Sequence, residues 1–90
     1  MEMYEAILTL KSPEECVRFF DDLCSITELR AIEQRYQVAR LLSEGQIYNT
    51  ILEQTGASSA TISRVNRSLQ YGKGSYELVF SRLDRKDTKD

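Results

Sequence analysis

A segment in the second half of the chain carries hydroxyl, methyl and guanidinium side chains but no carboxylate. No acidic residue occurs between Glu53 and Glu77, and Arg64, Arg67 and Lys73 give that segment three positive charges. The whole chain has a net charge of −2, so the rest of the chain carries a net charge of −5. DNA binding gains free energy when Lys and Arg displace counterions from phosphates, and nearby carboxylates would oppose this. The charge pattern therefore favours contact with DNA through one face and argues against a protein that coats DNA with its whole surface.

The same segment has the pattern of a helix-turn-helix. Residues 46–54 predict a helix of about two and a half turns, with Ile47, Ile51 and Leu52 facing inward. Gly56 would end this helix. Apolar residues then recur at the spacing of one face of a second helix, which stops at Gly72 and Gly74; they are Ile62, Val65 and Leu69. Two short helices braced by apolar residues across a tight turn are what this motif requires.

The outward face of the second helix supplies most of the residues that we expect to contact DNA. Ser59, Ala60 and Ser63 are slim enough to approach base edges in the major groove, and Thr61 can share this role. Arg64 and Arg67 can reach guanine or phosphate, and Lys73 is expected on phosphate. The full candidate set consists of Ser58, Ser59, Ala60, Thr61, Ser63, Arg64, Arg67 and Lys73, with Gln46 and Asn49 from the start of the preceding helix.

The elements that must position this face are all predicted to be helical. Strand-type alternation is absent, and apolar residues recur three and four positions apart almost throughout. A short first helix is expected around residues 4–8, before Ser12, Pro13 and Glu15 provide a strong start for the next one. A long helix should begin near Ser25 or Thr27 and end at Gly45, and a last one should cover residues 75–84. We expect a single domain over residues 1–84 and a flexible charged tail over residues 85–90.

The second and third predicted helices have apolar bands that are wider than one face. A surface helix of a monomer needs only one apolar stripe. These bands therefore favour a homodimer whose core is shared between two copies of the chain. The alternative is that the two helices bury each other and the flanking helices within one chain.

Composition argues against several other classes of protein. The chain has no His and two Cys, so it lacks the usual soft ligands of zinc and the commonest general base, and we expect neither enzymatic activity nor a metal or other cofactor. Cys16 and Cys24 are expected to be small core residues, with a disulfide between subunits as the alternative. Apolar runs are too short to span a membrane, and the acidic N-terminus is unlike a secretory signal. We expect a cytoplasmic protein without a membrane partner.

Several motifs resemble those of one known family. The segments Gly56–Ala57, Ala60–Arg64 and Ser68–Leu69 are similar to the DNA-reading region of the Trp repressor superfamily. The wider pattern resembles the shorter YerC/YecD branch of that superfamily, through the segments 12–15, 28–32, 34–36 and 71–74. The resemblance covers residues 12–83. It implies a six-helix chain that intertwines with a second copy and presents two helix-turn-helix motifs to successive major grooves.

The resemblance also implies a candidate effector pocket. Arg35 and Arg64 fall at the positions of the two arginines that flank the corepressor in the Trp repressor, and Ser68 and Thr27 match other pocket residues. Val65, however, replaces a glycine whose missing side chain makes room for the indole ring. We therefore expect that tryptophan is not the corepressor, while another small effector remains open.

These observations predict a homodimeric, sequence-specific DNA-binding regulator of transcription, with repression as the expected mode. The alternative is a helical module that binds another protein and has no direct contact with DNA. The two differ in the surface that they need, because a protein-binding module should expose an apolar groove or patch, whereas a DNA reader should expose a polar helix face that lacks acidic residues.

Overall fold

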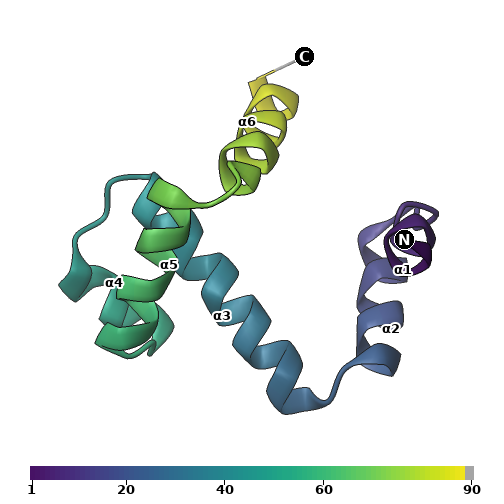
Figure 1. Cartoon of the computed structure of the whole chain (residues 1–90), viewed down its shortest axis with the longest axis horizontal. Helices are drawn as coiled ribbons and strands as arrows, with labels where there is room; N and C mark the ends of the chain where they lie inside the picture. The colour runs from purple at the N-terminus through teal and green to yellow at the C-terminus, as the bar shows by residue number, and fades with distance from the viewer. Residues whose placement is uncertain (89–90) are drawn as a thin grey trace. The chain divides into compact units, whose positions relative to one another are not determined.

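The computed structural model describes the backbone of residues 1–88 and the side chains of residues 1–85. The described residues form six α-helices and no strand (Figure 1). The helices are α1 (Glu2–Ile7), α2 (Pro13–Leu23), α3 (Ile26–Ser43), α4 (Tyr48–Thr55), α5 (Ser59–Tyr71) and α6 (Ser75–Thr88). The all-helical prediction is therefore confirmed. None of the helices within residues 1–88 is long and apolar enough to cross a membrane.

Three of the helices begin with serine caps. The Ser12 hydroxyl accepts a hydrogen bond from the Glu15 amide at the start of α2, and Pro13 occupies the first turn. At the start of α3, Ser25 and Glu28 each accept a hydrogen bond from the other's backbone amide, at 3.1 and 2.8 Å. This reciprocal pair is a capping box. The hydrogen bonds from Ser25 lower the pKa of Glu28. The ionised Glu28 in the capping box therefore stabilises the folded state, and this stabilisation is lost as the pH falls through the lowered pKa.

The chain divides into two compact units, Met1–Ile32 and Glu33–Asp90. The first unit contains α1, α2 and the beginning of α3, and none of its residues is buried. Val17, Leu23 and Ile26 are half or more exposed. These three apolar positions, which belong to the bands that predicted a shared core, are thus largely uncovered in a single copy of the chain. Cys16 and Cys24 were expected to be small core residues, but in a single copy of the chain Cys16 is exposed and Cys24 is half-buried.

The core lies in the second unit. Its buried residues come from α3, α4, the turn after α4, α5 and α6, and they are Val38, Ala39, Ile51, Ala57, Ile62, Val65 and Phe80. Leu41, Leu42, Leu52, Leu69 and Tyr76 pack against them. Five of the six positions predicted to brace the helix-turn-helix are among these residues, and they are Ile51, Leu52, Ile62, Val65 and Leu69. The second half of α3 and α6 therefore form the support on which α4 and α5 are held.

The boundaries differ from the sequence prediction at two places. The helix expected from residue 46 begins at Tyr48, because Gly45 has a left-handed φ of 84° and the Gln46 amide bonds to the Leu41 carbonyl at the end of α3. Gln46 thus belongs to the turn that follows α3, and Ile47, which was expected to face inward, is 66% exposed. At the other end, α6 continues to Thr88 and so includes residues 85–88 of the predicted flexible tail, while residues 89–90 lie outside the described part.

Candidate nucleic-acid interface

The turn between α4 and α5 is held by hydrogen bonds and by one glycine. Gly56 has a φ of 69°, and its amide donates to the Leu52 carbonyl at 3.0 Å. Other residues adopt this left-handed conformation only with strain, so glycine suits the end of α4. Thr55 bridges the turn, because its hydroxyl donates to the Ile51 carbonyl at 2.7 Å and accepts from the Ala57 amide at 3.1 Å.

Gln34 connects this turn to α3. Its side-chain amide donates to the Thr55 carbonyl at 3.1 Å across a sequence separation of 21 residues. Neither Gln34 nor Thr55 was predicted to matter for the site. A hydroxyl beside the turn glycine is a signal that sequence analysis could have used, whereas the partner of Gln34 depends on how α3 packs. Together the two residues join the turn between α4 and α5 to α3.

The start of α5 is capped by Ser58. Its hydroxyl accepts from the Thr61 amide and donates to the Thr61 hydroxyl, both at 3.1 Å. Ser58 therefore has a structural role in addition to the DNA contact predicted for it. Thr61 is half-buried, so it is less available than its neighbours.

The capping role of Ser58 gives a direct prediction. Ser58→Ala should lower the free energy of unfolding by about 1 kcal/mol, because the first turn of α5 loses its side-chain acceptor. Urea denaturation followed by circular dichroism measures this. Ser63→Ala is the matched control, since Ser63 is exposed on the same helix and is expected to lose no stability. Equal losses in the two variants would contradict the capping role.

The remaining residues of the predicted DNA-contacting face of α5 are exposed. Ser59 and Ser63 are one turn apart, as are Ala60 and Arg64, and Arg67 follows Ser63 by one further turn. Lys73 is exposed in the turn before α6, and Asn49 is exposed in the first turn of α4. Gln46 is also exposed but precedes α4. The structure thus places these residues on the surface of α4, α5 and their flanking turns.

Arg64 and Arg67 make no ion pair with any residue whose side chain is described. Both ion pairs found among residues 1–85 involve Arg40 of α3, which contacts Glu44 and Asp84. The guanidinium groups on α5 are therefore not neutralised by any carboxylate within residues 1–85. An arginine without an internal partner is available for a phosphate or for a base edge.

The beginning of α4 differs from those of α2, α3 and α5. Ile47 occupies its N-cap and supplies no side-chain acceptor. The first backbone amides of α4 are consequently left without a capping side chain. Free amides at a helix start, together with the positive end of the helix dipole, suit an anion such as a DNA phosphate.

Two of the four candidate effector residues line one depression in the surface. Arg64 and Ser68 line a shallow depression on α5 of about 300 Å³, together with Arg67, Tyr71 and Gly72, but Arg35 does not line it. Thr27 belongs to the first unit. Val65 is 2% exposed, so its isopropyl group is part of the core.

Comparison with known proteins decides the family. The model of the Trp repressor protein family matches residues 1–84. The chain belongs to the Trp repressor family. The chain is 50% identical over 88 residues to YerC of Bacillus subtilis (strain 168), described as uncharacterized, and the match covers 98% of this chain and 85% of YerC.

Two solved structures have the same fold. A crystal structure of a candidate Trp repressor from Staphylococcus aureus matches with a TM-score of 0.89 and 49% sequence identity. The match covers 92% of this chain and 83% of the Staphylococcus aureus chain. The crystal structure of a TrpR-like protein from Eubacterium eligens ATCC 27750 matches with a TM-score of 0.89 and 51% sequence identity. This match covers 92% of this chain and 86% of the Eubacterium eligens chain. The expected Trp-repressor-like fold is confirmed by these neighbours. Trp repressors are regulatory DNA-binding proteins, which suggests the same broad role for this member of the family.

Proposed function

We propose that the protein is a homodimeric, sequence-specific regulator of transcription that reads DNA with α5. The observation that carries this proposal is the exposed face of α5, on which Arg64 and Arg67 have no ion-pair partner among the described side chains. Ser59, Ala60 and Ser63 precede them on the same exposed surface. Small side chains let the start of a helix enter the major groove, while the arginines contact phosphate or guanine.

The uncapped start of α4 gives a second point of attachment. In a helix-turn-helix complex the first helix lies across the DNA backbone while the second enters the groove. Backbone amides of α4 and the exposed side chain of Asn49 can donate to one phosphate, and Lys73 can contact another. Contacts of this kind fix the position of α5 but carry no sequence information.

Dimerisation completes the proposal. The first unit has no buried residue, and its apolar side chains Val17, Leu23 and Ile26 are half or more exposed. A second copy that covers these side chains would bury apolar surface and stabilise both chains. Light scattering at micromolar concentration should give twice the mass of one chain, whereas the mass of a single chain would contradict the shared core.

Selection of bound DNA from a random pool tests the function and the dimer together. A symmetric dimer should select two related half-sites in inverted orientation, with centres about 34 Å apart along the duplex. Recovery of no enriched sequence would contradict sequence-specific binding. A helical module that binds only another protein predicts this negative result.

Tryptophan should not act as the corepressor. Val65 fills part of the core with its isopropyl group, so the space that a glycine would leave is occupied. Isothermal titration with L-tryptophan should show no saturable heat, and operator affinity should not change when tryptophan is added. A saturable heat accompanied by tighter DNA binding would refute this prediction.

A further inference from the structure

A groove with a volume of about 740 Å³ lies between the end of α3, the second half of α5 and α6. All of its lining residues belong to the second unit. Its size is in the range of small-molecule sites, roughly 300–1,000 Å³. It differs from the candidate effector pocket, because neither Arg35 nor Arg64 lines it and only Ser68 is shared.

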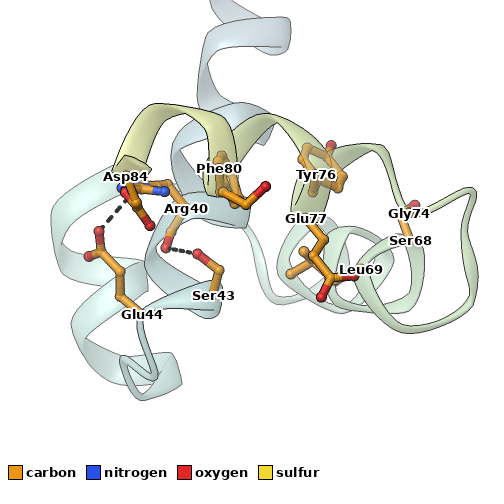
Figure 2. Close-up of a pocket in the computed structure, with 11 residues that line it drawn as sticks. Arg40, Ser43, Glu44, Ser68, Leu69, Gly74, Tyr76, Glu77, Phe80 and Asp84 are labelled. Atoms are coloured by element: carbon orange, nitrogen blue, oxygen red, sulfur yellow. Dashed lines mark hydrogen bonds and ion pairs between the residues drawn. The ribbon is translucent and has the colours of Figure 1, made fainter. Parts of the chain in front are cut away.

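The walls of the groove include an apolar and aromatic surface. Tyr76 and Phe80 of α6 stack with their ring centroids 5.9 Å apart, and Leu69 of α5 lies across from them (Figure 2). Phe80 is 6% exposed, so it belongs mainly to the core, while Tyr76 is half-buried. Such a surface suits the apolar body of an organic molecule, and the face of an aromatic ring also attracts cations.

The charges in the groove are predominantly negative. Glu44, Glu77 and Asp84 line it, whereas Arg40 is the single cation among the lining residues. The Arg40 guanidinium is 2.6 Å from Asp84 and 3.2 Å from Glu44, and it lies 4.7 Å from the centre of the Phe80 ring. Its charge is thus already engaged, and it does not offer a free site to an anion.

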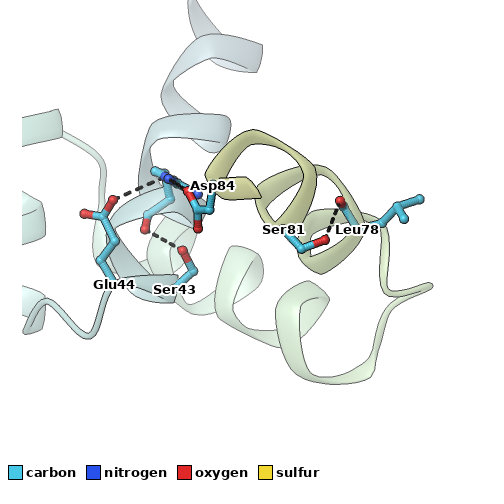
Figure 3. Close-up of polar contacts among 6 residues, drawn as sticks. Ser43, Glu44, Leu78, Ser81 and Asp84 are labelled. Atoms are coloured by element: carbon cyan, nitrogen blue, oxygen red, sulfur yellow. Dashed lines mark hydrogen bonds and ion pairs between the residues drawn. The ribbon is translucent and has the colours of Figure 1, made fainter. Parts of the chain in front are cut away.

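Two hydroxyl groups in the lining are oriented as acceptors. The Ser43 hydroxyl donates to the Arg40 carbonyl at 2.7 Å, and the Ser81 hydroxyl donates to the Leu78 carbonyl at 2.9 Å (Figure 3). A hydroxyl has one hydrogen to donate, so while these bonds are kept each of these oxygens accepts from a ligand. These two positions of the groove therefore suit a molecule that donates hydrogen bonds.

Glu77 is the carboxylate in the groove that is not engaged. It forms no ion pair with any side chain in the described range, residues 1–85. It lines the groove together with Leu69 and lies about two helical turns before Asp84 on α6. A cation at Glu77 would therefore meet a free carboxylate next to an apolar surface and away from the Arg40 guanidinium.

We propose that this groove binds a small organic cation, an amine or guanidine that carries an apolar body. The cationic group lies at Glu77, where it forms a charge-assisted hydrogen bond, and the body packs on Leu69 and Tyr76. The exposed apolar residues of α6, which are Leu78, Val79 and Leu83, do not line the groove and remain available to a second copy of the chain. Binding of the cation to the groove does not depend on the proposed function. Only an effect of the bound cation on DNA recognition by α5 would rest on that function.

Phenethylammonium is a suitable probe, with 2-phenylethanol and 3-phenylpropionate as its neutral and anionic counterparts. Each is titrated into the full-length ¹⁵N-labelled protein at fixed pH and ionic strength, without DNA, and the amide shifts are followed by NMR. The amine should shift the amides of Ser68, Leu69 and residues 74–80 in a saturable manner, with an affinity about tenfold higher than either counterpart. Equal affinity for the alcohol, tighter binding of the acid, or no shift of these amides would overturn the proposal.

A pair of conservative variants locates the cation. Glu77→Gln keeps the shape of the side chain and should weaken binding of phenethylammonium about tenfold, because the ligand loses an ionic partner. Glu53→Gln is the matched control, since Glu53 is exposed on α4 and does not line the groove, and it should bind as the unaltered protein does. Unchanged binding in the Glu77 variant, or an equal loss in the Glu53 variant, would contradict the assignment. The titration contains no DNA, so failure of the proposed DNA-binding function would leave its outcome unaffected.

Discussion

Ile62→Ala is expected to lower the free energy of unfolding by about 2–5 kcal/mol. Ile62 lies on α5, has no exposed surface and is among the largest fully buried side chains. Its removal leaves a cavity between the helices of the second unit, where the neighbouring side chains can relax only partly. Chemical denaturation of the purified protein measures the loss at a fixed protein concentration, because the stability of a dimer depends on concentration.

Ile47→Ala is the matched control for this prediction. The same atoms are removed, but Ile47 is 66% exposed at the N-cap of α4, so the stability should change by no more than about 0.5 kcal/mol. If both variants lost a similar amount of unfolding free energy, burial of Ile62 in the core of the second unit would not be what holds α5 in place. A smaller loss at Ile62 than at Ile47 would contradict the packing described above.

The double substitution of Arg64 and Arg67 by alanine should weaken operator binding at least tenfold. Each copy of the chain loses two guanidinium groups that have no ion-pair partner among the described residues, so a dimer loses four contacts to phosphate or guanine. Both residues are exposed, and the helical signal in far-ultraviolet circular dichroism should stay unchanged. Fluorescence anisotropy on the selected operator gives the affinity.

The charge-matched control replaces Arg18 and Arg82 by alanine. These two arginines are exposed on α2 and α6, outside the helix-turn-helix. The control removes the same number of charges, so it should retain most of the affinity if α5 makes the contacts. Intact binding after loss of Arg64 and Arg67 would mean that another face of the protein reads DNA.

Local patterns predicted much of the fold, because they depend on residues that are close in the sequence. Ser12 and Ser25 cap the helices that follow them, and Gly56 ends α4 as expected. The apolar spacing of Ile62 and Val65 identified the buried face of α5 correctly. Each of these features follows from side-chain chemistry within about one helical turn.

Features that depend on packing were less accessible. Ile47 was expected to face inward because it continues the apolar spacing of Ile51, but the turn that follows α3 includes Gln46 and delays the start of α4. The hydrogen bond from Gln34 to the Thr55 carbonyl joins residues 21 positions apart, which periodicity cannot identify. The groove beside Glu77 combines α3, α5 and α6, so its lining became visible only with the packing of these helices.

The salt dependence of operator affinity tests the central claim most directly. If Arg64, Arg67 and Lys73 of two chains each displace a counterion, log K should fall linearly with log salt with a slope of about −5. In the variant without Arg64 and Arg67, the slope of log K against log salt should be less negative by about 4. Fluorescence anisotropy across a salt series gives both slopes. An affinity that does not change with salt, or an equal slope in the two proteins, would contradict DNA binding through the exposed face of α5.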